Sequence, residues 1–371
     1  MIRVCHISTV HQAKDTRIYH KECATLAALG YDVKLVVVNA EDTTSDYHNV
    51  EIVNIELAPV GKMKRVFYYP KQALSKVLDL APTVAHLHDP ELLQIVPSLK
   101  AAGIKVIYDA HEDVPKQVLT KDWIPRPLRG LVSRWVQRYE HKMALKLEAV
   151  VTVVEGVLER FEPLVRQIVL VKNFPDLDQL PRAASWAEKA NEVAYIGDLT
   201  RIRGILSVVD AMADVDVRLN LAGKWSDLGL EGDCKRSLGW NRVNPLGFIS
   251  RAEASTVLER SKIGLILFHP APNHMDALPN KLFEYMAAGI PVVASDFGWL
   301  KHIVEQRECG LTADPKDPKS IARALQQLLD DPAQAEAMGR RGREAVLHTY
   351  HWAAEAKKLG ALYNNLIGNP S

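Results

Sequence analysis

The stretch PNKLFEYMAAGIPVVASD, residues 279–296, shows the pattern from which the fold of its half of the chain can be deduced. A turn residue, Pro279, precedes a run with helical character, and Gly289 stands where such a helix would end. The apolar run 292–294 that follows predicts a buried strand. The stretch therefore predicts a helix that leads into a strand of a parallel sheet.

The start of this helix is a candidate anion site, because helix N-termini carry unpaired N–H groups and partial positive charge. The amides expected to face a phosphate are those of Asn280, Lys281 and Leu282. Glu284 could accept hydrogen bonds from a polyol such as a ribose. The alternative is an ordinary helix on which Glu284 only meets water.

Composition limits the class of protein. A chain of 371 residues is long enough for two domains, and a formal charge of +1 gives no general attraction to nucleic acid. No apolar run reaches the roughly 18 residues of a membrane span, and the start has no signal-peptide pattern, so we expect a cytoplasmic protein. The four cysteines form no C-x-x-C pair, which disfavours a zinc site or disulfides.

Alternating strand and helix patterns organise the first half of the chain. Apolar runs at 2–7 and 33–38 flank a segment with helical spacing, 18–29, as in a parallel α/β unit that binds ligands where its strands end. The first loop has no G-x-G-x-x-G, which disfavours a nicotinamide dinucleotide. It holds instead a polar cluster, which is either a binding group or a simple helix cap: Lys14, Asp15, Thr16 and Arg17.

Histidines and carboxylates follow two further strands. His88 and Asp89 come directly after the apolar run 84–87, and His111 and Glu112 follow the next predicted strand. Because the carboxyl ends of parallel strands meet at one edge of a sheet, these side chains are expected to lie together. The sequence thus predicts a functional site there, with His111 as its main candidate.

Two basic stretches indicate contact with an anionic surface. Residues 62–71 interleave lysine and arginine with Phe67, Tyr68 and Tyr69, and residues 125–147 predict an amphipathic helix. Four basic residues recur at every fourth position of that helix: Arg134, Arg138, Lys142 and Lys146. We interpret both stretches as membrane contacts. The alternatives are a solvated loop and a helix whose apolar face is in the core.

The second half repeats the architecture of the first without repeating its sequence. Residues 176–192 have weak periodicity and predict a linker, and strand-like runs follow at 193–196, 217–222 and 263–268.

Taken together, several motifs resemble the retaining GT-B glycosyltransferases of family 4. They are YIGDLTRIRG, LAGKW, PLGFIS, IGLILF, PNKLFEYMAAGIPVVASD and the closing HTYHWAAEAKKLGALYNNLI. The opening VHQAKDTRIYHKE, with HLHDPELL and DAHEDVP, is similar to a bacterial branch associated with capsule, exopolysaccharide or O-antigen synthesis. The resemblance implies an α/β fold with two Rossmann-like domains whose parallel sheets face each other across a cleft. Residues 1–175 would bind the acceptor and 176–350 the donor, and residues 351–371 would form a helix that crosses back to the first domain.

The same resemblance implies roles for individual residues. Glu284 would bind the nucleotide ribose, and Asp276 stands in place of a glutamate that contacts the sugar hydroxyls. Where the family commonly has an arginine and a lysine for the diphosphate, this chain has Asp198 and Arg203. We therefore expect Asp198 to point elsewhere and Arg201 or Lys281 to assist Arg203.

The complete assignments are as follows. The expected catalytic residues are His111, Arg203 and Glu284. The expected donor-binding residues are Arg201, Arg203, Gly223, Lys224, Phe248, Ile249, Asp276, Asn280, Lys281, Leu282 and Glu284, of which Phe248 and Ile249 would hold the base. The expected acceptor-binding residues are Asp15, Thr16, Arg17, His88, Asp89, His111 and Glu112.

The expected function is retaining hexosyl transfer from a UDP- or GDP-linked sugar to a saccharide or lipid-linked acceptor, in bacterial surface polysaccharide synthesis at the inner membrane. No metal or cofactor is expected, because in the fold resembled cations and a helix N-terminus stabilise the departing diphosphate. One alternative is an enzyme like UDP-N-acetylglucosamine 2-epimerase. Another is a subunit that binds nucleotide sugars but has lost activity, which Asp198 and Asp276 would favour.

Overall fold

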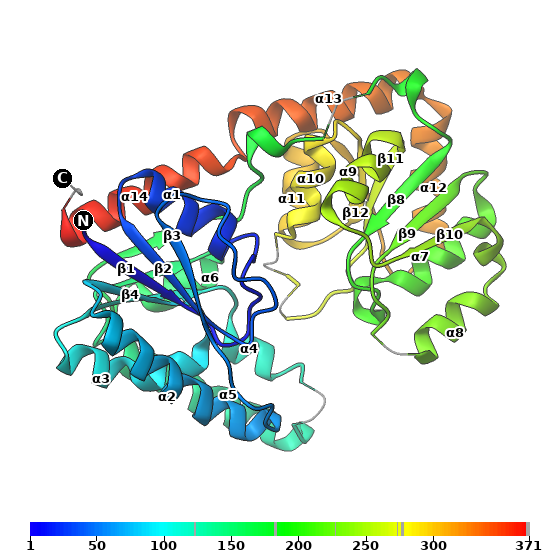
Figure 1. Cartoon of the computed structure of the whole chain (residues 1–371). Helices are drawn as coiled ribbons and strands as arrows, with labels where there is room; N and C mark the ends of the chain where they lie inside the picture. The colour runs from blue at the N-terminus through cyan, green and yellow to red at the C-terminus, as the bar shows by residue number, and fades with distance from the viewer. Residues whose placement is uncertain (122–123, 182–183, 227, 273, 276–277, 369–371) are drawn as a thin grey trace. The chain divides into compact units, whose positions relative to one another are not determined.

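The structure, a computed structural model, describes residues 1–121, 124–181, 184–226, 228–272, 274–275 and 278–368 (Figure 1). The chain divides into two compact units. Unit 1 consists of Met1–Asn173 and Ala353–Ser371, and unit 2 of Phe174–Trp352. The sequence predicted changes of domain after residues 175 and 350.

Unit 1 contains a seven-stranded parallel sheet in the order β3-β2-β1-β4-β5-β6-β7. Its strands are short runs rich in apolar residues, as expected of strands covered on both faces. They are β1 Arg3–Ile7, β2 Asp32–Val38, β3 Val50–Ile55, β4 Val84–Leu87, β5 Lys105–Ala110, β6 Ala149–Thr152 and β7 Ile168–Leu170. The strand order reverses between β1 and β4, which is where sheets of this kind bind ligands.

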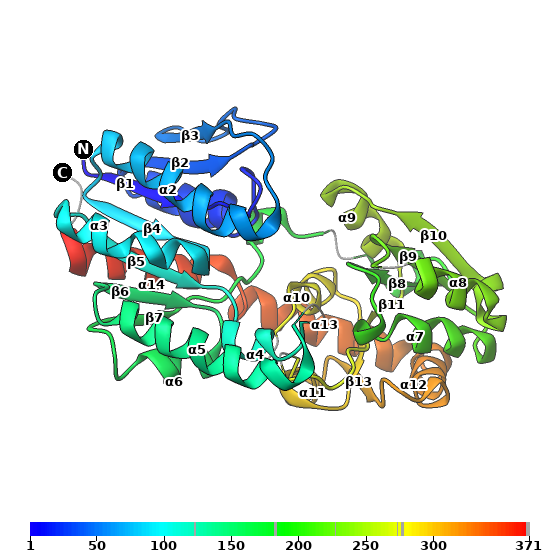
Figure 2. The ribbon, with the colours of Figure 1, turned by 90° about the horizontal axis from the view of Figure 1, so that it is seen from below.

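Helices cover both faces of this sheet. They are α1 Ala24–Ala28, α2 Lys62–Leu80, α3 Val96–Ala101, α4 Val114–Val118, α5 Arg126–Ala144, α6 Glu155–Phe161 and α14 Trp352–Ile367, with a π-helical turn at Ile18–Cys23 and a 3₁₀ segment at Pro90–Ile95. Helices α2, α3, α5 and α6 contribute to a hydrophobic core with the side chains of Cys5, Ile7, Ala85 and Leu87. Helix α14 lies on the opposite face of the sheet (Figure 2).

The basic and aromatic stretch 62–71 forms the first half of α2 and is not a loop. Pro70 lies inside this helix and has no N–H to donate to the carbonyl of Val66, four residues earlier. The side-chain amide of Gln94 donates to that carbonyl over 2.7 Å instead. A tertiary contact therefore allows the helix to continue past the proline.

The C-terminal helix α14 packs on unit 1, as predicted. The Tyr363 hydroxyl lies 2.9 Å from Nδ1 of His86 on β4, and the Tyr31 hydroxyl donates to Asn364 over 3.2 Å. At the start of α14, the Glu355 carboxylate accepts the backbone N–H of Lys172 over 2.8 Å. These contacts anchor both ends of the helix to unit 1.

Unit 2 contains a six-stranded parallel sheet in the order β10-β9-β8-β11-β12-β13. Its strands are β8 Glu192–Ile196, β9 Arg218–Ala222, β10 Val243–Gly247, β11 Ile263–Ile266, β12 Val292–Ser295 and β13 Gly310–Ala313. Its helices are α7 Ile205–Ala211, α8 Leu228–Arg236, α9 Arg251–Arg260, α10 Asn280–Ala287, α11 Gly298–Gln306, α12 Pro318–Asp330 and α13 Pro332–His348. The strand order reverses between β8 and β11. The two sheets confirm the predicted α/β class.

The four cysteines are free and buried. Across the described part of the chain, no helix combines the length and apolar character that crossing a membrane requires.

Candidate functional site

Helix α10 is the helix predicted from residues 279–296. Pro279 precedes its first turn, and Gly289 follows its end with a φ of 67°, as predicted. Every residue from 281 to 288 is buried except Glu284, which is exposed. The carboxylate of Glu284 is therefore open to a ligand, while the rest of the helix packs in the core of unit 2.

One prediction for the start of α10 is wrong. The amide of Leu282 donates to the carbonyl of Pro279 over 3.0 Å, so it does not face a phosphate. The carbonyl of Pro279, the residue before the helix, accepts this N–H group and so closes the first turn of α10. The amides that remain as candidates are those of Asn280 and Lys281. Asp276, the expected sugar ligand, lies outside the described residues.

Lys281 is a buried cation without a hydrogen-bond acceptor among the described residues. Its Nζ atom lies 3.9 Å from the centre of the Tyr195 ring. Gly197 has a φ of 135°, and a Cβ atom there would come within 2.7 Å of that Nζ, so a larger residue would strain the backbone and displace the ammonium group. Burial, and then the nearby charge of Arg203, lowers the pKa of Lys281 to about 7.

Arg203 is the second cation at the carboxyl edge of the unit 2 sheet. Its Nη1 atom lies 3.0 Å from Oδ2 of Asp198. Asp198 therefore points toward Arg203, and the prediction that it points elsewhere is wrong. The Arg203 side chain is 31% exposed and that of Asp198 is 66% exposed, which leaves the pair open to solvent. Arg201, the other expected cation, forms an ion pair with Asp233 of α8. Lys281 and Arg203 therefore provide the positive charge next to Gly197.

The ends of three adjacent strands, β8, β9 and β10, complete this edge. Gly223 follows β9 with a φ of 150°, and a Cβ atom there would clash with the carbonyl oxygen of Gly197, 1.9 Å away. Lys224 places its Nζ 4.6 Å from the ring centre of Phe248, which is 74% exposed. An exposed aromatic ring beside a glycine-lined edge is a surface on which a flat base can stack.

In unit 1, the predicted histidines meet around Asp109, at the end of β5. Oδ2 of Asp109 lies 2.9 Å from Nε2 of His111 and 3.4 Å from Nδ1 of His88. The guanidinium of Arg17 donates to both Asp109 oxygens, over 2.9 Å and 3.0 Å. Burial alone would raise the pKa of Asp109, but Arg17 and then His111 hold it well below its usual range. A buried carboxylate thus fixes His111, which is half-exposed.

Three expected acceptor-binding residues are buried. Arg17 is 4% exposed, and His88 and Asp89 are each 2% exposed. Arg17 is held by Asp109, and Asp89 accepts the backbone N–H of Thr9 over 2.5 Å. These three residues therefore support the edge of the sheet and do not themselves reach an acceptor, which corrects the prediction.

The remaining acceptor candidates are closer to the surface. Asp15 accepts the amides of Arg17 and Ile18 over 2.8 Å and 2.9 Å, so it caps the following helical turn, as the alternative interpretation held. Thr16 is half-buried and Glu112 is exposed. Thr16, His111 and Glu112 thus remain candidates for contact with an acceptor.

The sequence analysis missed the partners that bind these histidines together. Asp109 and Glu22 were quoted only as parts of motifs and were given no role, and His6 was not considered. His6, Glu22, His86 and His88 lie in one buried cluster. A histidine inside an apolar strand, as in β1, is the signal that could have indicated them.

Two family models match the chain, and together they span residues 17–345. The model "Glycosyl transferases group 1" matches residues 176–345, and "Glycosyltransferase Family 4" matches residues 17–179. The chain belongs to the GT-B glycosyltransferases.

Relatives of known identity agree with this family. The glycogen synthase of Mycobacterium tuberculosis is 24% identical over 245 residues, which are 63% of this chain and 58% of that protein. The solved sucrose-phosphate synthase of Thermosynechococcus elongatus has a TM-score of 0.79 at 21% identity, with 99% of each chain covered. Anabaena HepE, solved with UDP and glucose, has a TM-score of 0.74 at 14% identity, with 98% of this chain and 100% of that chain covered. The chain spans about half the length of the first curated relatives that it matches, and the structural likeness establishes the fold alone.

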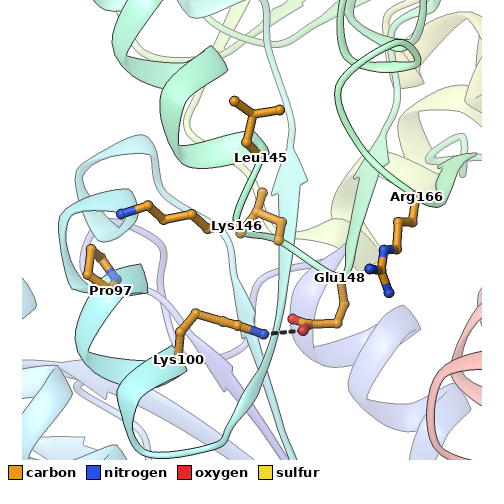
Figure 3. Close-up of a pocket in the computed structure, with 7 residues that line it drawn as sticks. Pro97, Lys100, Leu145, Lys146, Glu148 and Arg166 are labelled. Atoms are coloured by element: carbon orange, nitrogen blue, oxygen red, sulfur yellow. Dashed lines mark hydrogen bonds and ion pairs between the residues drawn. The ribbon is translucent and has the colours of Figure 1, made fainter.

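In unit 1 of this GT-B glycosyltransferase, seven residues line a hollow of about 440 Å³ (Figure 3). Its lining residues are Pro97, Lys100, Leu145, Lys146, Leu147, Glu148 and Arg166. Glu148 and Arg166 come just before β6 and β7, so the hollow lies at the amino edge of the unit 1 sheet. Ligands of such sheets bind at the carboxyl edge, where His111 lies.

Proposed function

We propose that the protein is a retaining hexosyltransferase that uses a nucleotide sugar as donor. The observation that carries this proposal is the group formed by Lys281, Arg203 and Glu284 at the carboxyl edge of the unit 2 sheet. It combines a buried ammonium that has no acceptor within the described ranges, an accessible guanidinium and one exposed carboxylate. A nucleotide sugar offers the complementary groups, a diphosphate and a ribose diol. The UDP and glucose bound by Anabaena HepE favour a UDP-linked sugar as the first donor to test.

The proposed chemistry needs the chain's own charges. Departure of a nucleoside diphosphate builds negative charge on the phosphate oxygens, and fixed cations in a partly dry site stabilise that charge. Lys281 and Arg203 would supply these cations, and Glu284 would hold the ribose hydroxyls. Transfer without a metal is part of the proposal. No side chain is assigned as a nucleophile. We therefore favour direct attack by the acceptor on the donor sugar, from the same face of the sugar that the phosphate leaves.

The proposal is tested with nucleotides before any acceptor is known. UDP, GDP, ADP and CMP are added to the purified protein, and the nucleotide that binds should raise the unfolding temperature. The matching nucleotide sugars are then tested for turnover. A product in which the sugar is epimerised would favour the epimerase alternative. Nucleotide binding without turnover, with every acceptor tried, would favour the alternative of an inactive subunit. The ion pair between Asp198 and Arg203 is the reason to test this alternative.

Glu284→Ala should weaken donor binding about thirtyfold, because two hydrogen bonds from ribose hydroxyls to a carboxylate are lost. The free energy of unfolding should change little, since the side chain is exposed. Isothermal titration of both proteins with the donor measures the loss. The control is Glu305→Ala, an exposed glutamate of α11. Equal affinity of the Glu284 variant and the wild type would contradict the ribose assignment.

Asp198→Asn should strengthen donor binding about threefold to tenfold. The carboxylate lies 3.0 Å from Arg203, and its removal frees that guanidinium and removes repulsion of a diphosphate. Titration with the donor measures the gain, and Asp216→Asn is a matched control because Asp216 is an exposed acid that pairs with Arg242 in the same unit. A loss of affinity would mean that Asp198 holds Arg203 in its working position.

We also propose that the acceptor is lipid-linked and that unit 1 binds an anionic inner-membrane surface. Leu128, Leu131 and Trp135 recur on α5 at helical spacing and are 47%, 62% and 65% exposed. Arg134 and Arg138 are exposed on the same helix. This part of α5, whose apolar face would be in the core under the alternative interpretation, therefore presents apolar and basic side chains to the outside, as interfacial helices do.

The double change Leu131→Glu and Trp135→Glu should lower binding to vesicles that contain anionic lipid about tenfold or more. Co-sedimentation with vesicles measures this, and raised salt should weaken wild-type binding because exposed arginines contribute. Leu238→Glu, at a residue 84% exposed in unit 2, serves as the control. The membrane proposal would be overturned if the wild-type protein did not bind the vesicles at low salt.

A further inference from the structure

A second group of chemically active side chains lies inside unit 1, where β1 and β4 run side by side. It consists of His6, Glu22, His86 and His88, all buried, and each offers one ligand atom within 4.8 Å of the others. His6 and His86 are partners in the register of β1 and β4 and point to the same face of the sheet. Glu22 reaches them from the π-helical turn Ile18–Cys23, a type of turn that is frequent at functional sites.

The distances between these side chains fit a single cation. Nδ1 of His6 lies 2.9 Å from Nε2 of His88 and 3.9 Å from Oε2 of Glu22, and Nδ1 of His86 lies 4.0 Å from the same oxygen. Ligands about 2.1 Å from a zinc-type ion lie roughly 3 to 4 Å from one another. Three imidazoles and one carboxylate are also the donors that such ions prefer.

Several polar atoms of the cluster lack partners. Nε2 of His6, Nε2 of His86 and both carboxylate oxygens of Glu22 are buried without a hydrogen bond among the described residues. The nearest cation to Glu22 is Arg17, 3.0 Å from Oε1, but its guanidinium already donates to both oxygens of Asp109. Buried polar atoms are nearly always bonded, so the unpaired Oε2 atom of Glu22, which faces Nδ1 of both His6 and His86, indicates a missing partner.

The charge around Glu22 is also unbalanced. Two neighbouring buried carboxylates, Asp109 and Glu22, face the single positive charge of Arg17. The cluster thus needs one more positive charge, either a cation or a proton on Glu22.

We propose that His6, Glu22, His86 and His88 bind one divalent cation of the zinc type. The surrounding residues suit this role, because Asp109 lies 3.4 Å from Nδ1 of His88, the nitrogen that does not face His6. Such partners orient ligating imidazoles. Because all four ligands are buried, the ion has a structural role. It joins β1, β4 and the π-helical turn beneath His111, and it stabilises unit 1 whether or not the protein transfers sugars.

The test begins with metal content. Tag-free protein, purified without chelator, is analysed for metals and is expected to carry a stoichiometric amount of one transition metal. Because the site is buried, the protein is also unfolded with chelator and refolded with and without Zn²⁺. Zinc should raise the unfolding temperature of the refolded protein by several degrees, and Co²⁺ in its place should give the visible absorption of a four-coordinate site.

Variants locate the site. Glu22→Gln and His86→Asn should lose the metal and the zinc-dependent stabilisation, whereas His302→Asn, at an exposed histidine of α11, should keep both. If the two variants fail to fold, the metal content and Co²⁺ spectrum of the wild type still decide the question. A wild-type protein without stoichiometric metal, whose unfolding temperature is the same after refolding with and without Zn²⁺, would overturn the proposal and leave a proton on Glu22 as the balancing charge.

Discussion

Lys281→Met is expected to weaken binding of the donor nucleotide sugar about 100-fold near pH 6.5. The ammonium of Lys281 lies in the core of unit 2, 3.9 Å from the Tyr195 ring centre, and has no acceptor in the part of the chain that the structure describes. A diphosphate would give it the partner that it lacks. At this buried position a hydrogen bond between charged groups stabilises the complex more than it would at the surface. Methionine keeps the unbranched stem of the side chain up to Cε and removes the ammonium group.

The pH dependence of binding distinguishes this role from a packing role. Burial lowers the pKa of Lys281 to about 7, so above that pH the free protein holds the amine neutral. A bound diphosphate raises this pKa again, and binding therefore takes up a proton. Wild-type affinity should fall as pH rises above about 7, by at most about tenfold per pH unit, and affinity of the variant should not. The diphosphate of a nucleotide sugar does not titrate in this range.

The stability of the free protein should change in the opposite sense. The unfolded chain binds the Lys281 proton up to about pH 10.5 and the folded chain only up to about 7. The unfolded state thus holds more protons between these values, and wild-type stability gains from rising pH across that window. Below it, the buried ammonium costs its full desolvation, so Lys281→Met should be more stable than the wild type there.

The measurements for Lys281 are titration calorimetry with the donor and thermal unfolding without it, each from about pH 6 to 9. Calorimetry in two buffers of different ionisation enthalpy reports the proton uptake directly. Lys235→Met, at an exposed lysine paired with Glu231, is the control. Wild-type binding that takes up no proton at about pH 8 would show that Lys281 does not meet the phosphates.

His111→Ala is expected to lower turnover about 100-fold to 1,000-fold while donor binding stays within about twofold. Asp109 holds Nε2 of His111 at 2.9 Å, and Arg17 holds Asp109, so the half-exposed imidazole is fixed in advance. We propose that it contacts the transferred sugar or the acceptor hydroxyl. A group fixed before the reaction costs no reorganisation during it.

Single-turnover rates with saturating donor measure the chemical step for His111→Ala, and calorimetry measures donor binding. His348→Ala, at an exposed histidine of α13, is the matched control. A parallel loss of donor affinity and rate would place His111 in donor binding instead. Wild-type rates in the variant would remove it from the mechanism.

Helix α10 shows how far local sequence could reach. Its start after Pro279, its end before Gly289 and the strand that follows are all as predicted, because turn residues and apolar spacing act within a few residues. The fate of the Leu282 amide was mispredicted for the same reason. Which N–H groups of a first turn stay free depends on how the chain enters the helix, and residue types do not show that.

Helix α5 marks the limit of amphipathic patterns. The sequence predicted the helix, and its later apolar residues, such as Met143, are buried as the core interpretation held. Leu131 and Trp135 follow the same spacing and are exposed. A helical stripe tells which side chains share a face, but only the neighbouring elements decide how much of that face is covered.

The sequence by itself determined the order of strands and helices, the parallel α/β class and the positions of Glu284 and His111 at strand and helix ends. Each follows from interactions within a few turns of the chain. The tertiary structure decided the partners. Arg17 and Asp109 are 92 residues apart in sequence, and His86 and Tyr363 are 277 apart. Such contacts, and the missing partner of Lys281, depend on burial and charge after folding, when distant strand ends meet at one edge of a sheet.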